Sequence, residues 1–463
     1  MCSEVHKKNI EKIRKYGRVA REDIFKRLLM QYKHGRLLAR GAGAGFMFRV
    51  TTVCLGFFVH LLLARWLDAR GYGDYAFAVA SIELLILFGL MGFRGAAIRF
   101  TATYCGNAEW SLMRGFLRTG AAVVLAACLV IGAGGAAILL LFSDRLRPAL
   151  IYTLLFSFFL LPFAGLLHFV SGVLQGLKRI IEARLPLDMM QQALLIIGFL
   201  VLTGIAGFQP TGYLAMGVLA AATGLALVAA YIFTARSLPA EISEVRAEYR
   251  IRTWMGAAVT LLLLGSFHRV LNQADILMLG MLRGTEQAGL YNVAVRVTGL
   301  IAFPLTSANM IAAPLFAELH SSGEKRDLQQ HLTLVCRGIV LFTLPIAAVV
   351  IAAGTWLLGL FGESFRAGYI PLVILTGGQL TSALFGPVSL LLTMTGHQVR
   401  AAWIVGGAAF LNIGLNGILI PLFGIQGAAA ASAGTLILWN TLLWVVVKRN
   451  VDVYSGPIYW KKR

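Results

Sequence analysis

The sequence predicts an all-α integral membrane protein with twelve transmembrane helices. Of its 463 residues, 58% are hydrophobic and 13% are charged, whereas an ordinary soluble domain has about 25% charged residues. The mean hydropathy is +0.77. Apolar stretches of about 20 residues, the length that crosses ~30 Å of hydrocarbon, recur from residue 43 to residue 447. These observations exclude a soluble protein and leave little of the chain for a soluble domain.

Charges, glycines and prolines delimit the apolar runs, and each run is long enough to span the bilayer. The expected spans are 43–64, 75–98, 119–142, 149–175, 187–207, 212–235, 255–282, 288–315, 338–360, 369–395, 401–420 and 427–447. A long polar interruption follows the sixth span. The expected organisation is a basic N-terminal tail at 1–42, a six-helix lobe at 43–235, a cytoplasmic linker at 236–254, a second six-helix lobe at 255–447 and a basic C-terminal tail at 448–463.

The two lobes repeat a short motif at the same place. Gly73-Asp-Tyr75 follows the first span, and Gly289-Leu-Tyr291 follows the seventh, 216 residues later. Because six spans separate them, the repeats have the same orientation in the membrane. Parallel repeats related by an axis along the membrane normal are a common transporter plan with a central site between the halves.

Lysine and arginine are distributed unevenly between the two ends of the expected spans. With the N-terminus inside, 32 of the 41 Lys and Arg residues lie in cytoplasmic segments and six lie in outer loops. This is the positive-inside pattern, so both termini are expected in the cytoplasm. The net charge of +20 therefore reflects membrane orientation, and no nucleic-acid partner is expected.

The N-terminal tail carries twelve Lys and Arg residues before the first apolar run. It has no short apolar core with a cleavage site, so we expect it to stay on the mature protein. Between residues 5 and 38, Ile10, Ile13, Ile24 and Leu28 recur at near-helical spacing. The tail is either an amphipathic helix on anionic inner-leaflet lipids or a solvated basic segment.

Motifs of soluble enzymes are missing from the sequence. It contains no P-loop, no GxSxG and no HExxH, and its five cysteines show no CxxC spacing. We therefore expect no enzyme activity, no cofactor and no metal site.

Arginines inside the spans are the first candidate site residues, because ionisable side chains in a bilayer usually face a bundle interior or a water-filled cavity. Arg49 lies in the first span, Arg269 in the middle of the seventh and Arg296 in the eighth. On the 216-residue offset, Arg49 corresponds to a position one helical turn from Arg269. Both guanidinium groups are expected to converge on one anion, such as a phosphate. The alternative is that each arginine snorkels or pairs locally.

The seventh span also carries a polar stripe. His268, Asn272 and Asp275 are spaced i, i+4, i+7 and share one helix face. His268 and Asn272 are candidate substrate contacts. Asp275 and Arg296 have similar depths below a short loop, so a structural ion pair is favoured over a role in substrate contact.

Glu83 is the other deeply placed acid. It either takes part in proton or cation coupling or pairs with Arg49. Arg94 is expected at the inner rim, where it would meet lipid headgroups. His60 and His168 lie on apolar stretches and are expected to be satisfied core residues.

Several short motifs together resemble the polysaccharide-flippase branch, the Wzx-type proteins, of the multidrug/oligosaccharidyl-lipid/polysaccharide (MOP) exporter superfamily. They occur in the order typical of that branch over about residues 43–447. The segments are Ala64–Tyr75, Gly92–Arg99, Leu174–Gly176, Asp275–Gly280 followed by Gly289–Tyr291 and Arg296, and Phe423–Gly427.

The resemblance implies a V-shaped bundle of two six-helix lobes, as in MATE transporters. It implies a flippase in the bacterial cytoplasmic membrane that moves a polyprenyl-diphosphate-linked oligosaccharide to the outer leaflet by alternating access. Other polysaccharide assembly proteins would be its partners. Two alternatives remain: a multidrug exporter of the same superfamily, and a membrane-embedded polymerase or glycosyltransferase. Arginines inside the spans suit an anionic diphosphate, and the ten-residue outer loop at 65–74 is short for an enzyme of that kind.

Overall fold

The structure, a computed structural model, describes residues 47–457, apart from the side chains of residues 263–265. Its contacts divide the chain into Met1–Cys54 and Leu55–Arg463. In the first unit, residues 47–54 are helical and Arg49 is exposed. The basic tail at 1–42 lies outside the described residues, so the amphipathic helix and the solvated segment both stay predictions for it, as does the division into lobes and linker.

The described part of the chain is helical, with no β-strand. Helix Met47–Leu90 comes first. The next are α2 (Phe93–Gly106), α3 (Trp110–Leu141), α4 (Pro148–Gly176), α5 (Ile180–Arg184), α6 (Gln191–Leu200), α7 (Gly212–Ser237), α8 (Glu241–Glu244) and α9 (Ile251–Arg283). The remainder are α10 (Thr285–Ser321), α11 (Lys325–Ala352), α12 (Gly354–Gly359), α13 (Tyr369–Phe385), α14 (Val388–Met394) and α15 (Gln398–Asn450). Short 3₁₀ turns lie at Ser143–Arg145 and Glu363–Gly368, and π-helical turns lie at Leu185–Met190 and Val201–Ile205.

Within residues 47–457, nine helices are long and apolar enough to cross a membrane, and the two parts of α9, bent by 51°, make a tenth span. Two of the nine, Met47–Leu90 and α15, have 44 and 53 residues, about twice the length that a bilayer requires. Left-handed backbone at Asp68 (φ 59°) and Gly424 (φ 58°) interrupts them. Counting each as two spans is consistent with the twelve that the sequence predicts. The chain is a multi-pass membrane protein.

Several helices are longer than the apolar runs that predict them. Helix α3 begins at Trp110 rather than at residue 119, and α10 extends to Ser321. A helix does not end where its apolar stretch ends, because polar residues continue it into the interface. The Arg114 guanidinium of α3 donates there to the backbone carbonyls of Ser243 and Val245, at 2.8 and 2.5 Å.

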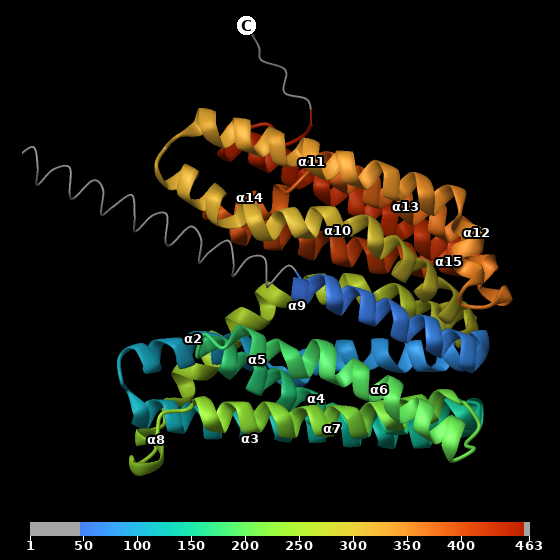
Figure 1. Ribbon diagram of the computed structural model, residues 1–463, viewed down its shortest axis with the longest axis horizontal. Helices are drawn as coiled ribbons and strands as arrows, with labels where there is room; N and C mark the ends of the chain where they lie inside the picture. The colour runs from blue at the N-terminus through green and yellow to red at the C-terminus, as the bar shows by residue number, and fades with distance from the viewer. Residues whose placement is uncertain (1–46, 458–463) are drawn as a thin grey trace, which may run out of the picture. The chain divides into compact units, whose positions relative to one another are not determined.

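Within Leu55–Arg463, the helices form two groups (Figure 1). The first helix group consists of residues 55–90 and α2 to α7, in which α4 packs against α2, α3 and α7. The second helix group consists of α10 to α15, in which α13 packs against α10, α11 and α15. Helix α9 contacts both groups, since it packs against α2 and α3 as well as α10 and α15.

The beginning of α9 is built into the first helix group. Trp254 is fully buried, and its indole N–H donates to the Tyr104 hydroxyl at 2.9 Å. Gly92 has φ 80°, and a Cβ there would overlap the Ala258 carbonyl. Glycine therefore allows both the left-handed turn and the close approach of α9.

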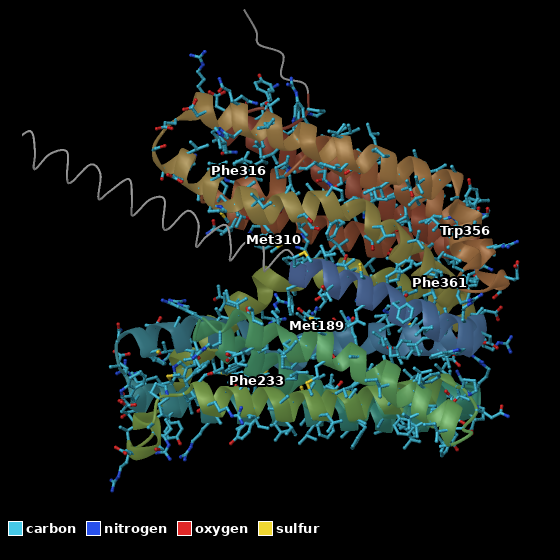
Figure 2. The ribbon with its side chains drawn as sticks, viewed as in Figure 1. Met189, Phe233, Met310, Phe316, Trp356 and Phe361 are labelled. Atoms are coloured by element: carbon cyan, nitrogen blue, oxygen red, sulfur yellow. The ribbon has the colours of Figure 1, made fainter. Side chains whose placement is uncertain are left out.

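The outer surface of the helices is apolar. Side chains such as Val130, Leu141 and Phe410 are 71%, 79% and 72% exposed. Figure 2 shows Trp356 and Met310 among the exposed side chains, whereas Phe316 and Phe361 are buried. An apolar surface of this extent suits contact with lipid chains.

Candidate functional site: an arginine cluster and two cavities

An ion pair joins residues 55–90 to α9. Arg269 Nη2 lies 3.2 Å from Glu83 Oε2, and the two side chains are 28% and 34% exposed. Glu83 thus has a basic partner in α9 that the sequence did not predict, because depth along the sequence does not show which helices face each other. Its pairing with Arg49 stays a prediction. The convergence of Arg49 and Arg269 on one anion stays a prediction.

Two further arginines lie close to this pair. Arg94 of α2 is within electrostatic reach of Arg184, Arg269 and Glu83, and Arg184 pairs with Asp188 at 3.5 Å. We call Arg94, Arg184 and Arg269 the arginine cluster. Three guanidinium groups face two carboxylates, so the cluster keeps an excess positive charge. Three half-buried guanidinium groups with excess charge can bind an anion with several oxygens.

Arg94 was expected at the inner rim, and the structure gives it a partner inside the first helix group. Its side chain is half-buried, and Nη1 lies 3.3 Å from Nδ1 of His168. His168 is therefore a polar partner for the cluster as well as a core residue. Neither Arg94 nor Arg184 could be assigned to the site from the sequence, because both lie near polar loops that suggest an exposed rim.

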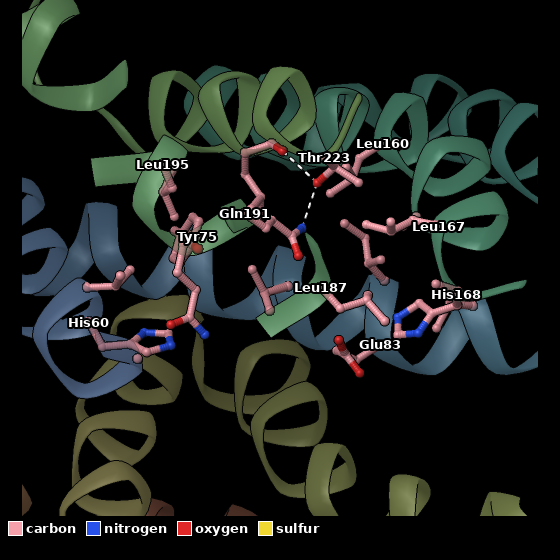
Figure 3. Close-up of a pocket in the computed structure, with 18 residues that line it drawn as sticks. His60, Tyr75, Glu83, Leu160, Leu167, His168, Leu187, Gln191, Leu195 and Thr223 are labelled. Atoms are coloured by element: carbon pink, nitrogen blue, oxygen red, sulfur yellow. Dashed lines mark hydrogen bonds between the residues drawn. The ribbon is translucent and has the colours of Figure 1, made fainter. Parts of the chain in front are cut away.

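A cavity of about 160 Å³ lies in the first helix group next to the arginine cluster. We call it the Gln191 cavity; its polar lining includes His60, Tyr75, Glu83, His168, Gln191 and Gln192. Figure 3 shows His60 and Tyr75 on one side of it and Glu83 and His168 on the other. Glu83 thus belongs both to the cavity and to the ion pair with Arg269.

A hydrogen-bond chain leads from this cavity to the second helix group. His60 Nδ1 lies 3.0 Å from the Tyr72 hydroxyl, which donates to Asn292 Oδ1 of α10 at 2.9 Å. Tyr72 and Asn292 are 0% and 4% exposed. His60 is satisfied on this side, as the sequence predicts. Arg296 is exposed on α10, within electrostatic reach of His60 and Tyr75.

The expected ion pair between Asp275 and Arg296 is wrong for the described residues. The buried Asp275 carboxylate instead accepts hydrogen bonds from the Tyr291 hydroxyl at 2.6 Å, from Asn416 Nδ2 at 2.6 Å and from the Ser432 hydroxyl. Tyr291 and Arg296 are five residues apart, which separates them by roughly 140° around α10. Depth below the loop does not determine which side of α10 faces α9.

The polar stripe on α9 faces a second cavity, of about 270 Å³. This cavity lies between α9 and the second helix group. Asn272 and Asp275 line it together with Asn412, Ser432 and Trp439. The His268 ring lies beside the Trp439 ring, with centroids 5.7 Å apart. Asn272 and Asp275 therefore line one cavity, whereas Arg269 pairs with Glu83, which lines the other. The sequence grouped residues that the structure separates.

The role of Asp275 can be tested by its stability effect. Asp275→Ala removes the acceptor that Tyr291, Asn416 and Ser432 share, and Asn416 alone keeps another one, Asn412 Oδ1. Unfolding should therefore become easier by about 1–3 kcal/mol. Arg296→Ala should leave the melting temperature of the detergent-purified protein nearly unchanged. Equal destabilisation by the two variants would support an ion pair between Asp275 and Arg296 and contradict the hydrogen bonds described above.

The two helix groups meet closely at the end that contains Asp68, which we call the Asp68 end. Asp74 is 2% exposed and accepts hydrogen bonds from Thr285 Oγ1 at 2.5 Å and from Arg147 Nη2 at 2.8 Å. Arg70 pairs with Glu286 at 3.4 Å. These contacts join residues 70–74 to the start of α10 and hold the Asp68 end closed.

Glycine allows this closure. A Cβ on Gly289 would lie 2.8 Å from Gly73 Cα, so the backbones touch without side chains between them. Gly73 and Gly289 are the first residues of the motif that recurs after 216 residues, and Arg70 and Glu286 have the same separation. The repeated motif thus identified segments that contact each other, although the sequence did not show the contact.

No group of three or more His, Cys, Asp or Glu side chains within residues 47–457 is arranged to hold a metal ion.

Comparisons with known proteins agree with this architecture. The family model described as polysaccharide biosynthesis protein matches residues 38–320. The probable low-salt glycan biosynthesis flippase Agl15 of Haloferax volcanii is 28% identical over 176 residues, 36% of this chain and 36% of the relative. The chain thus aligns with about a third of that relative's length.

Two solved structures share the fold. An inward-facing multidrug resistance transporter of the MATE family, MOP superfamily, is 15% identical with a TM-score of 0.67, covering 86% of this chain and 94% of the other. Lipid II flippase MurJ in an inward closed conformation is 14% identical with a TM-score of 0.66, covering 87% of each chain. The resemblance inferred from the sequence is confirmed, and because the family model covers more than half of the chain, the protein belongs to the polysaccharide biosynthesis protein family.

Proposed function

We propose that the protein is a flippase that moves a polyprenyl-diphosphate-linked oligosaccharide from the inner to the outer leaflet of the bacterial cytoplasmic membrane, for surface polysaccharide assembly. The observation that carries the proposal is the arginine cluster, in which α9 and the first helix group bring three guanidinium groups together. Membership in the polysaccharide biosynthesis family supports the same class of cargo. The curated flippase that aligns with part of the chain supports the reaction.

The arginine cluster supplies what a diphosphate requires. A guanidinium group binds two phosphate oxygens at once through parallel N–H donors. In the structure Glu83 pairs with Arg269. An arriving diphosphate displaces the carboxylate and takes over its hydrogen bonds, so Arg269 is kept in place by Glu83 until the substrate binds. Two other arginines, Arg49 and Arg296, are proposed as further contacts for the diphosphate as the substrate crosses the protein.

Alternating access requires one closed end, and we assign it to the outside of the membrane. With the basic residues in the cytoplasm, the Asp68 end lies outside, and its contacts between Asp74, Arg147 and Thr285 close the outer face. Substrate would enter from the inner leaflet. Release to the outer leaflet requires these contacts to break, and closure of the opposite end completes the cycle.

The proposed activity can be measured in proteoliposomes. Fluorescent undecaprenyl-diphosphate sugar is placed in both leaflets, and a membrane-impermeant quencher reports the fraction accessible from outside over time. The protein should accelerate exchange of this lipid but not of a neutral phospholipid carrying the same fluorophore. Equal exchange of both lipids, or of neither, would contradict the proposal.

Topology provides an independent prediction. Because 32 Lys and Arg residues lie in the segments assigned to the cytoplasm and six lie outside, tags at both termini should be inaccessible in intact cells. Single cysteines at Arg145 and Arg366 should react with an impermeant maleimide. Labelling of either terminus from outside would overturn the orientation. The proposed partners of the protein are other polysaccharide assembly proteins and, for the basic N-terminal tail, anionic lipids of the inner leaflet. A tail outside the cell would not meet those lipids.

A further inference from the structure

We propose that the Gln191 cavity holds the sugar ring attached directly to the diphosphate, a hexose or N-acetylhexosamine. This inference rests on the proposed function and names the part of the substrate that a second subsite recognises. Unlike the arginine cluster, the cavity has no Lys or Arg among the described residues that line it. Besides the Glu83 carboxylate, its polar lining consists of neutral amide, imidazole and hydroxyl groups. These suit hydroxyl groups, which both donate and accept hydrogen bonds.

The glutamines have unused hydrogen-bonding capacity. Gln191 Nε2 donates to Thr223 Oγ1 at 2.6 Å, and Thr223 donates to the Leu219 carbonyl at 2.7 Å (Figure 3). Thr223 therefore fixes the Gln191 amide and leaves its oxygen to accept from a ligand. Gln192 Oε1 is buried and has no hydrogen-bond partner within the described residues. A buried acceptor without a partner is costly, and a ligand hydroxyl would satisfy it.

The two histidines add one acceptor and one donor. The Tyr72 hydroxyl donates its proton to Asn292, so it accepts from His60 Nδ1–H, which leaves His60 Nε2 as an acceptor. A guanidinium group cannot accept, so Arg94 donates to His168 Nδ1, and His168 Nε2 carries the proton and donates. These two rings lie on opposite sides of the cavity in Figure 3, so they can bind different hydroxyl groups of one ring.

The position of the cavity fits a sugar bonded to the diphosphate. Glu83 lines the cavity and pairs with Arg269, and His168 lines it and accepts from Arg94. A diphosphate at the arginine cluster therefore has its sugar next to the Glu83 and His168 side of the cavity. The π-helical turn Leu185–Met190 directly precedes Gln191 and Gln192, and both amides contribute to the lining. Such turns frequently occur at functional sites.

The test compares two probes: undecaprenyl diphosphate, and undecaprenyl diphosphate carrying one N-acetylglucosamine. Wild-type protein should bind the sugar-linked lipid roughly tenfold more tightly, as expected for a few neutral hydrogen bonds. The double variant Gln191→Leu, Gln192→Leu should bind both lipids alike, with the affinity for the bare lipid unchanged. Unchanged binding of the bare lipid also shows that the variant is folded.

The control is Gln379→Leu, the same exchange in the cavity that contains Asp275. It should keep the wild-type preference for the sugar-linked lipid. Equal affinity of the wild type for the two lipids, a preserved preference in the double variant, or a preference lost in Gln379→Leu would each overturn the sugar subsite while leaving the flippase proposal standing. Binding of neither lipid to the wild type would overturn the proposed function itself.

Discussion

Arg269→Ala should reduce flipping of undecaprenyl-diphosphate sugar by about ten- to a hundredfold, the loss expected when a charge-assisted hydrogen bond worth about 1.5–3 kcal/mol is removed. Arg269 contributes both a positive charge and a planar pair of donors. Arg269→Lys keeps the charge but loses the bidentate geometry, so its rate should fall between those of the wild type and the alanine variant. The measurement is the leaflet-resolved assay at equal amounts of reconstituted protein.

Arg250→Ala is the matched control for this series. Arg250 precedes α9 and also pairs with a glutamate, Glu248, at 3.1 Å, but both side chains are more than half exposed. An exposed pair contributes little to stability, and this one lies outside the arginine cluster. Its loss should leave flipping unchanged. If Arg250→Ala and Arg269→Ala have equal effects, position in the cluster does not matter and the proposed anion site is wrong.

Gly73→Ala should abolish most of the transport by preventing closure of the Asp68 end. The added Cβ would overlap the Thr285 carbonyl and lie 3.1 Å from the Glu286 amide nitrogen. Because both are backbone atoms, residues 70–74 and the start of α10 must separate. Gly224→Ala is the control, since a Cβ there meets no atom within 4 Å.

Crosslinking reports the expected separation directly. Arg70→Cys and Glu286→Cys, introduced together without the native cysteines, replace a pair of side chains that meet at 3.4 Å. A short bifunctional reagent should crosslink them in the parent and in Gly224→Ala, and much less in Gly73→Ala. Full crosslinking together with lost transport would show that closure is intact and that Gly73 acts in another way.

Helix content and span positions could be predicted because apolar length alone determines what crosses a bilayer. Helix ends could not, since α3 begins nine residues before its apolar run and is held there by Arg114. The site was predictable only in part. Charges inside spans identified Arg269, Glu83 and Asp275. Depth along a helix does not show which way a side chain points around the helix axis, so Asp275 was paired incorrectly with Arg296 and the pair of Glu83 with Arg269 was not predicted.

Other site residues carried no signal in the sequence. Arg94 and Arg184 lie near loops, where basic residues usually report orientation. Gln191 and Gln192 are two amides at the start of an otherwise apolar helix, and only the fold shows that they share a cavity with His60. The motif that is repeated at Gly73 and Gly289 was the one feature of the sequence that linked distant segments. Its two copies lie in contact at the Asp68 end.

The most direct test of the account is the affinity of undecaprenyl-diphosphate sugar for two variants, each of which removes one partner of the ion pair between Glu83 and Arg269. If Glu83 holds Arg269 until a diphosphate replaces it, Glu83→Gln removes a competitor and should tighten binding several-fold, whereas Arg269→Gln should weaken it at least tenfold. If the ion pair between Glu83 and Arg269 only stabilises the fold, the two variants should change affinity in the same direction or not at all. Opposite signs are the predicted result, and equal signs would contradict it.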